Sequence, residues 1–304
     1  MKKADAILTG DIEIRSFQPT CRIDDHWTAQ QRKFDFLNEL QQEHGCPVFD
    51  SGDLFDKKYK THPSHELLGW AMKNLPQPFY TVPGNHDLPG KSIQNYSNSA
   101  MAVLERAGKL IVAFPQCATV AFDCDAHGFP WGQSIEEPQL SYGHCVNVAL
   151  VHAMVYKGEL PFPGCEGYSA QEVMDLLPGF DLIVTGHHHQ TFTHRDGNRL
   201  LVNPGSFMRN DADQIDHKPC VFLWYADTNR VKRVYLPIEQ GVISREHIEI
   251  KNDRVNRLGA FVEKLGEQAV DGVNFHRNLE NAVAGAKLKQ PVVDKIWNYY
   301  EGKS

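Results

Sequence analysis

The sequence predicts an α/β fold, and three features indicate it. Short β-branched, apolar segments recur along the chain and are continuous rather than alternating, which is typical of strands buried on both faces. Segments with helical periodicity lie between them, as expected for an α/β sandwich. Several strands end in polar residues, at the edge where open α/β sheets bind ligands. The strands with such ends are predicted at 6–10, 47–52, 79–83, 146–151 and 182–185.

Helices and further strands complete this pattern. Segments 109–123, 200–202, 220–225 and 231–236 follow one another as strands, and we expect them to add antiparallel strands to a second sheet. The basic pair in the middle of 231–236 indicates a half-exposed strand. The helices of the first part of the chain are predicted at 27–44, 66–75, 97–107 and 170–177.

The composition changes near residue 246, which divides the chain into a main domain, 1–245, and a C-terminal helical part, 246–304. Amphipathic helices are predicted in the second part at 254–265, 275–286 and 291–300. They form either a small subdomain or a set of helices packed back on the core, and the pattern favours neither.

Composition excludes several classes of protein. The seven cysteines are odd in number and form no CxxC, which argues against a disulfide framework and a thiolate zinc site. No apolar run is long enough to span a membrane, and the acidic residues after the basic start argue against a signal peptide, so we expect a cytoplasmic protein. The net charge of −7 argues against a protein that coats nucleic acid. The 15 histidines indicate metal or proton chemistry.

The polar residues at the strand ends are of metal-binding types. Asp, Asn and His supply oxygen and nitrogen ligands suited to Mn, Fe or Zn rather than to Ca alone. One Asp shared by two ions would hold them ~3.5–4 Å apart, the spacing used for in-line displacement at phosphorus. The candidate residues are Asp11, Asp53, Asn85, His86, Asp87, His152, His187 and His189.

In this order, the motifs resemble the five metal motifs of the calcineurin-like metallophosphoesterases. The resemblance runs from residue 11 to residue 189 and implies a four-layer α/β/β/α sandwich, here with a short C-terminal helical segment, and two divalent metal ions. The motifs are Asp11-Ile12-Glu13, Gly52-Asp53-Leu54-Phe55-Asp56, Gly84-Asn85-His86-Asp87, His152 and Gly186-His187-His188-His189, followed by an Asn203-Pro204-Gly205-Ser206 turn.

The resemblance also implies a role for each residue. Asp53 would bridge the ions, Asp11 and His189 would bind the first, and Asn85, His152 and His187 would bind the second. His86 would stabilise the transition state or protonate the leaving oxygen, and Asp87 would orient His86. Asp56 would either face the substrate or cap the next segment. His188 is expected to be structural, and most of the remaining ten histidines, which match no motif, are expected at the surface.

One motif departs from the family pattern, because Glu13 stands where a His ligand is usual. Glu13 either binds the first ion or points away and leaves a weak site. We favour binding, since period-two spacing puts Asp11 and Glu13 on one side of an extended segment. The added negative charge favours Mn²⁺ or Mg²⁺ over Zn²⁺, so we expect Mn, with Mg, Fe or Zn as alternatives.

The substrate class follows from finer similarity. Protein phosphatases of this type show Asp-Arg-Gly and Asn-His-Glu, which Asp56-Lys57-Lys58 and Asn85-His86-Asp87 do not match. Segments 52–56 and 80–87 are instead similar to SbcD-type DNA-repair nucleases and, more loosely, to phage-encoded relatives, which would act in the host cytoplasm. This implies a nuclease that cleaves DNA with a metal-bound hydroxide. Basic residues that could guide the DNA backbone are Lys57, Lys58, Lys60 and Arg209.

Two other functions stay open. The first is a cyclic-nucleotide or small-nucleotide phosphodiesterase, and the second is a catalytically silent binding scaffold on the same fold. The largely intact motifs argue against the scaffold. SbcD-type nucleases bind an ATPase partner, and no segment of this chain resembles the part that does so. A homodimer is compatible with the sequence, and a membrane partner is not expected.

Overall fold

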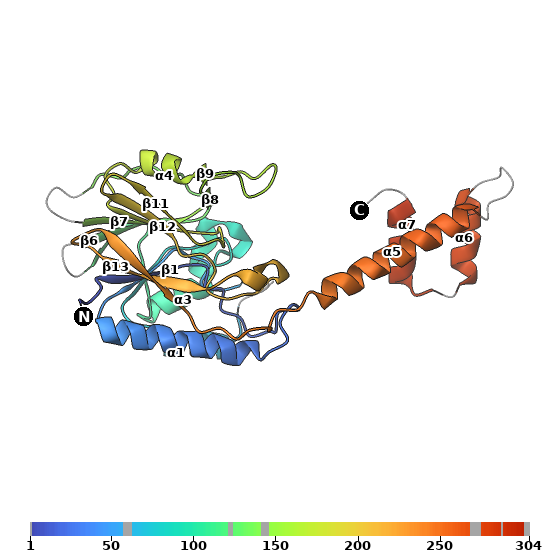
Figure 1. The fold of residues 1–304 in the computed structure, drawn as a ribbon, viewed down its shortest axis with the longest axis horizontal. Coiled ribbons are helices and arrows are strands. Elements are labelled where there is room, and N and C mark those ends of the chain that lie inside the picture. Colours follow the sequence, from blue (N-terminus) through green and yellow to red (C-terminus); the bar gives the residue numbers. More distant parts are fainter. Residues whose placement is uncertain are drawn as a thin grey trace. The chain divides into compact units, whose positions relative to one another are not determined.

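The computed structural model describes residues 2–56, 63–120, 124–140, 146–267, 275–286 and 288–300. The chain divides into two compact units, Met1–Ile243 and Ser244–Ser304 (Figure 1). The larger unit contains two six-stranded sheets and the helices that flank them.

The first sheet has the strand order β14-β13-β1-β2-β3-β4. Strands β1 to β4 are parallel to one another, and β13 and β14 are antiparallel additions beside β1. The strands are β1 (Ala6–Thr9), β2 (Val48–Asp50), β3 (Phe79–Thr81), β4 (Ile111–Val112), β13 (Cys220–Tyr225) and β14 (Arg230–Tyr235).

The second sheet has the order β11-β12-β10-β7-β6-β5. Its four central strands, β12, β10, β7 and β6, are parallel, and β11 and β5 pair antiparallel at the two edges. A separate pair joins β8 (Val155–Tyr156) to β9 (Tyr168–Ser169). The strands are β5 (Ala118–Val120), β6 (Cys124–Phe129), β7 (Val146–His152), β10 (Leu182–Gly186), β11 (Phe192–Asp196) and β12 (Arg199–Asn203).

The expectation that all later strands join the second sheet antiparallel is wrong for several elements. β13 and β14 lie in the first sheet, β4 pairs parallel with β3, and β12 pairs parallel with β10. β13 is apolar on both sides because its side chains alternate between two cores: Val221 and Leu223 face the first, and Phe222 and Trp224 face the second. β14 is the half-exposed edge strand that its basic pair predicts.

Each helix of the larger unit begins at a polar cap. Asp25 accepts backbone N–H bonds at the start of α1 (His26–His44), which ends at the left-handed Gly45. Ser64 and Ser99 cap α2 (His65–Asn74) and α3 (Ala100–Arg106), and Ser169 forms a capping box with α4 (Ala170–Leu176). The predicted helix 97–107 is interrupted because Ser99 is a cap. Short 3-10 helices are η1 (Pro89–Lys91), η2 (Ile93–Asn98) and η3 (Ala212–Asp216).

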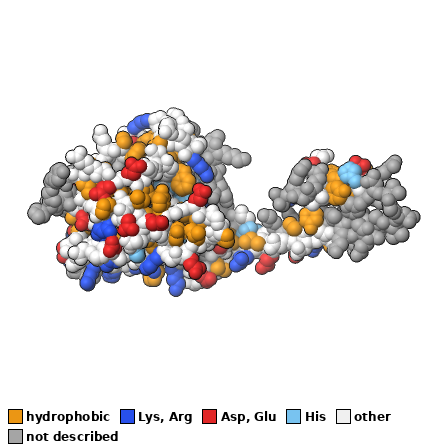
Figure 2. All heavy atoms as spheres, turned by 90° about the horizontal axis from the view of Figure 1, so that it is seen from above, with side chains coloured by type: hydrophobic (Ala, Val, Ile, Leu, Met, Phe, Trp, Pro, Cys, Tyr) orange, Lys and Arg blue, Asp and Glu red, His pale blue; other side chains and the backbone are white. Residues whose placement is uncertain are grey.

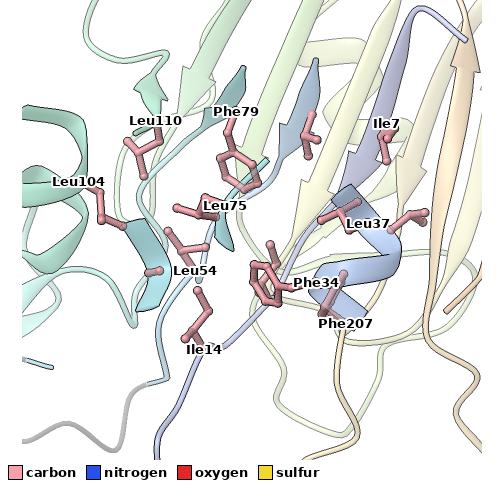
Figure 3. Close-up of a cluster of buried hydrophobic side chains, with 14 of the residues drawn as sticks. Ile7, Ile14, Phe34, Leu37, Leu54, Leu75, Phe79, Leu104, Leu110 and Phe207 are labelled. Carbon is pink, nitrogen blue, oxygen red and sulfur yellow. The ribbon is translucent and has the colours of Figure 1, made fainter. Parts of the chain in front are cut away.

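Three apolar cores hold four layers together, as predicted. The first core packs α1, α2 and α3 on the first sheet, and Figure 3 shows Phe34 and Leu37 of α1 facing Ile7 and Phe79. The second core fills the space between the two sheets. The third packs α4 on the outer face of the second sheet, so that α1 and α4 lie on opposite sides of the sheet pair (Figure 1).

The smaller unit consists of α5 (Glu246–Glu267), α6 (Phe275–Gly285) and α7 (Gln290–Tyr300). α5 begins eight residues before the predicted helix 254–265 and packs against α6 and α7. Leu279 and Ile296 are buried in it, and the ring of Trp297 lies 5.1 Å from that of His276.

The described parts of the chain include no helix that is both long and apolar enough to cross a membrane. On the face drawn in Figure 2, acidic and basic side chains of the larger unit are intermixed, and several Lys and Arg side chains lie along one edge.

Phe34 tests the first core. Its ring is fully buried and lies 4.9 Å from the ring of Trp70 and 5.6 Å from that of Phe207. Phe34→Ala should lower the free energy of unfolding by ~3–5 kcal/mol, because it removes a buried ring and leaves a cavity. Asp35→Ala, on the exposed side of the same helix, should change it by less than about 0.5 kcal/mol. Urea unfolding of both variants makes the comparison, and equal effects would contradict the assignment of Phe34 to the core.

Candidate metal centre

The predicted ligands lie where parallel strands of both sheets end, and their backbone is strained. Six non-glycine residues in the described part of the chain have a positive φ, and four of them are predicted ligands. Such a backbone is unfavourable for a residue with a Cβ and concentrates at functional sites. The four φ values are 47° at Asp11, 51° at Glu13, 55° at Asp53 and 75° at His187.

Two glycines let the strand ends approach each other. A Cβ on Gly84 would lie 2.1 Å from Asp53 Oδ1 and 2.4 Å from Asp53 N. A Cβ on Gly52, whose φ is +99°, would lie 2.7 Å from His152 Nδ1. These contacts are too short for any side chain, so glycine at both positions is a condition for bringing Asp53 and His152 together.

Three of the predicted second-ion ligands form one cluster. Ligand atoms of Asp53, His152 and His187 all lie within 4.8 Å of one another. Asn85, the fourth, places its Oδ1 3.2 Å from His152 Nε2. The carbonyl of Ser51 lies 2.7 Å from His152 Nδ1, which leaves Nε2 directed at Asp53 Oδ2, 3.2 Å away. A second hydrogen bond of this kind commonly orients a metal-binding imidazole.

His187 is held in the neutral form that metal binding requires. Burial and the neighbouring His152 lower the pKa of His187 to about 3. The indole of Trp131 lies beside it, with ring centroids 4.6 Å apart. His188 behaves as expected for a structural residue, since its Nδ1 lies 2.8 Å from the carbonyl of Val155.

The predicted first-ion ligands are also brought near one another, but more loosely. Asp11 is fully buried, and its Oδ1 accepts the backbone N–H of His187 at 2.8 Å. His189 is partly exposed, and its Nε2 lies 3.9 Å from Glu13 Oε1. Asp11 and Glu13 both have a positive φ, so the segment between them is not extended. The alternation of side chains along an extended strand therefore does not place these two residues on one side.

Glu13 points into the centre rather than away from it. Its Oε1 lies 3.3 Å from His86 Nδ1, and its Oε2 accepts from Asn210 Nδ2 at 3.0 Å and from Arg15 at 3.3 Å. Burial opposes ionisation of Glu13, but the contacts with His86, His189, Arg15 and Asn210 outweigh it and lower its pKa to about 2. Glu13 is therefore a carboxylate at neutral pH.

Asp56 lies close to Glu13 and His86. Its carboxylate is buried and pairs with Arg15 at 2.6 Å, and its ligand atom lies within 4.8 Å of those of Glu13 and His86. The segment that Asp56 was expected to cap, residues 57–62, lies outside the described residues. Asp56 fixes Arg15, which in turn holds Glu13.

His86 and Asp87 follow Asn85 but face different ways. His86 Nδ1 lies between Glu13 Oε1 and Asp53 Oδ2, which is 3.4 Å from it, and the backbone N–H of His86 donates to Asp53 Oδ1 at 2.8 Å. Asp87 does not orient this ring, contrary to expectation. Its carboxylate accepts three backbone N–H bonds, from Gly84, Leu54 and Phe55, and so ties the second motif to the third.

The residues fit a pair of divalent cations. Three buried carboxylates converge, and the Oδ2 atom of Asp11 has no hydrogen-bond partner among the described residues, while Asp53 Oδ2 faces only the imidazoles of His152 and His86. Buried carboxylate oxygens without donors are strongly unfavourable unless a cation compensates them. Asp53 Oδ2 lies 3.2 Å from His152 Nε2 and 3.4 Å from His86 Nδ1, so its carboxylate faces both groups of residues.

Several residues of the centre escaped the sequence analysis. Asn210 and Arg15 hold Glu13, and His26 was expected at the surface but is buried, with Nε2 3.1 Å from Asn210 Oδ1. They lie outside the family motifs, and only the fold brings residue 210 to residue 13. Of the basic residues expected to guide DNA, Lys57, Lys58 and Lys60 lie outside the described residues, and Arg209 is buried.

Comparison with known proteins identifies a family for the larger unit. A family model described as calcineurin-like phosphoesterase matches residues 7–191. No curated protein sequence matches the chain.

The solved structures similar to this chain include three with the following identity and coverage. A Thermus thermophilus protein is 14% identical, with a TM-score of 0.48 over 76% of this chain and 98% of its own. An archaeal phosphodiesterase is 12% identical, with a TM-score of 0.39 over 76% and 99%. A 5'-nucleotidase precursor, also from Thermus thermophilus, is 14% identical, with a TM-score of 0.42 over 83% and 59%.

Gly84→Ala tests the close approach at Asp53. The added Cβ would displace Asp53, so we expect the variant to lose high-affinity binding of divalent metal and to be less stable. Gly69→Ala is the control, since Gly69 lies in α2 with nothing within 4 Å of an added Cβ. It should bind metal normally and be more stable by ~0.5–1 kcal/mol. Metal stoichiometry by titration and thermal unfolding give the readouts, and normal binding in Gly84→Ala would contradict the geometry.

Proposed function

Because the chain belongs to the calcineurin-like phosphoesterase family, which implies metal-dependent phosphoester hydrolysis, we propose that it is a phosphodiesterase and that its substrate is DNA. The proposal is that two ions, Mn²⁺ in the first place, are held by seven residues. These are Asp11, Glu13, Asp53, Asn85, His152, His187 and His189.

The charge of the centre supports a diester over a monoester. Two divalent ions carry four positive charges, and the carboxylates of Asp11, Glu13 and Asp53 carry three negative ones, while Asp56 is balanced by Arg15. Counted over the ions and these carboxylates alone, one positive charge is in excess, which matches the single negative charge of a phosphodiester. A phosphomonoester carries nearly two at neutral pH. With the usual His in place of Glu13, the excess would be larger and would suit a monoester better.

His86 supports catalysis rather than a silent scaffold. Burial lowers the pKa of His86, but the contacts with Glu13 and Asp53 outweigh it, so that the net shift is upward. A raised pKa favours the protonated imidazole, which can stabilise a negatively charged transition state or protonate the leaving oxygen. Divalent ions, when bound, would supply a nucleophile from water at neutral pH and positive charge for the phosphoryl oxygens.

A DNA substrate is supported by the similarity of segments 52–56 and 80–87 to SbcD-type nucleases. A pocket of about 530 Å³ favours a second candidate, a cyclic-nucleotide or small-nucleotide phosphodiesterase. Its lining includes Trp131, Tyr168 and His152, so it adjoins the second-ion cluster with two aromatic rings that a nucleobase could contact. The same pocket could accept the base of a nucleotide at a DNA end.

A substrate panel distinguishes these functions. The metal-free protein is supplied with Mn²⁺, Mg²⁺ or Zn²⁺ and offered bis-p-nitrophenyl phosphate, p-nitrophenyl phosphate, cyclic AMP, and single- and double-stranded DNA. We expect Mn²⁺-dependent cleavage of the diester and of DNA, and His86→Ala should lower kcat by ~100-fold or more with metal binding retained. Cleavage of cyclic AMP but not DNA would establish the second candidate, and no turnover with any metal would establish a scaffold.

Glu13→His tests the charge argument. The substitution restores the usual family motif and removes one negative charge from the centre. The ratio of monoesterase to diesterase activity should therefore rise, by about tenfold if one charge is worth ~1.4 kcal/mol in the transition state. Glu13→Gln, which removes the charge without offering an imidazole, serves as the companion variant and should shift the ratio in the same direction. A ratio unchanged in both variants would show that charge does not select the diester.

A further inference from the structure

A basic pocket of about 170 Å³ lies apart from the residues of the metal centre. It is formed where α1, the segment before it and the chain at 209 and 237–239 come together. Four basic residues line it, and only two acidic ones do. The basic residues are Arg22, Arg32, Lys33 and Arg209, and the acidic ones are Asp24 and Glu239.

Both carboxylates of this pocket are already paired. Asp24 is bound by Arg22 through two hydrogen bonds, one of them from Nε at 2.8 Å and the other from a terminal guanidinium nitrogen. Glu239 pairs with Arg32, and both of these side chains are largely exposed at the rim. No carboxylate among those that line the pocket therefore remains to balance its two other cations.

Lys33 and Arg209 donate hydrogen bonds only to main-chain oxygens among the described residues, and Lys33 Nζ also lies 5.9 Å from the centre of the Phe207 ring. Lys33 Nζ donates to the carbonyl of Phe207 at 2.8 Å. Arg209 donates to the carbonyl of Glu239 at 2.6 Å and, weakly, to that of Ile215 at 3.4 Å, while its Nε has no partner. Two positive charges thus stand without a carboxylate partner.

These two cations are also buried. Only 2% of Lys33 and 4% of Arg209 are exposed. Burial and the nearby Arg22 lower the pKa of Lys33 and of Arg209, and each of these effects opposes the charged form. A buried charge without a counterion is costly, so this arrangement is stable only if Lys33 gives up its proton or an anion enters the pocket.

We propose that this pocket binds a phosphate-type oxyanion, with Lys33 and Arg209 as its main contacts. The excess of two positive charges matches the dianion that inorganic phosphate and phosphomonoesters form at neutral pH. Guanidinium and ammonium groups are the side chains that bind phosphate oxygens best. The volume admits one phosphate group with little else, which excludes a whole nucleotide inside the pocket.

The pocket is connected to the metal centre through one short segment. Phe207 accepts the hydrogen bond of Lys33, Arg209 lines the pocket, and the next residue, Asn210, holds Glu13 Oε2 at 3.0 Å. Arg22 also donates to the carbonyl of Arg209 at 3.2 Å. An anion between Lys33 and Arg209 would fix the segment that positions Glu13. The site is therefore suited to sense phosphate or a phosphomonoester group, and the latter is what hydrolysis of a diester leaves.

The test is a titration of the full chain, treated with a chelator, with inorganic phosphate at constant ionic strength set by chloride. We expect saturable one-to-one binding by calorimetry and an increase in Tm. Lys33→Met and Arg209→Gln should each weaken the affinity by about tenfold or more, because each removes a charged donor. Phenyl phosphate distinguishes the two sources of the group: binding equal to that of phosphate indicates an open site for monoesters, and its loss indicates free phosphate alone.

Two control variants locate the effect. Arg32→Gln removes a basic residue of the rim that already has Glu239 as its partner, and Asp53→Asn alters the metal centre; both should bind phosphate within about twofold of the unmodified chain. The absence of saturable phosphate binding in the unmodified chain would overturn the proposal. Unchanged phosphate binding in Arg209→Gln would also overturn it. The same holds if phosphate binding is lost in Asp53→Asn but kept in Lys33→Met. If Lys33→Met does not fold, Arg209→Gln and the unmodified chain decide the question.

Discussion

Buried negative charge at the meeting edge of the two sheets is the constraint on which the rest of the structure depends. Asp11, Glu13 and Asp53 each expose at most 4% of their surface, and their oxygens converge around His86 and His152. Carboxylates placed so close repel one another and lose their hydration, and such an arrangement persists only if the scaffold forces it and cations balance it. A metal centre at this edge would supply those cations.

The scaffold forces the arrangement through its backbone rather than through side-chain packing alone. The ligands leave their strands in strained, positive-φ conformations, and glycine at 52 and 84 lets two loops approach to distances that no Cβ allows. Asp87 accepts one backbone hydrogen bond from Gly84 of its own loop and two, from Leu54 and Phe55, that join the two loops, so a buried residue of one motif supports the other. Strain of this kind is stored only where surrounding layers are well packed, and the three apolar cores supply that packing.

The alternation of strands and helices along the chain and the convergence of the strand-end motifs could be predicted because each leaves a local mark in the sequence, whereas the four layers were implied by the resemblance to a known family. Buried parallel strands are continuous apolar runs, and their polar ends are short motifs. The sheet to which β13 belongs could not be predicted, because an apolar strand buried on both faces fits either sheet. The role of Asp87 was misassigned for a related reason: its neighbour in sequence is His86, but its partners are backbone N–H groups of a distant loop. Asn210, likewise, contacts Glu13 only through the fold.

Glu13 links the metal centre to the segment beside the basic pocket. A carboxylate in place of the usual imidazole adds a negative charge, and the chain accommodates it with three groups from different segments: Arg15 beside it, Asn210 from the loop after the Asn203–Ser206 turn, and His86 across the centre. Asn210 is itself held by His26 and lies next to Arg209 of the basic pocket. Glu13, which lowers the positive charge of the metal centre, is thus anchored by the segment that also contributes Arg209 to the basic pocket. Binding or release of an anion at Arg209 can therefore affect the metal centre through the next residue in the chain, Asn210.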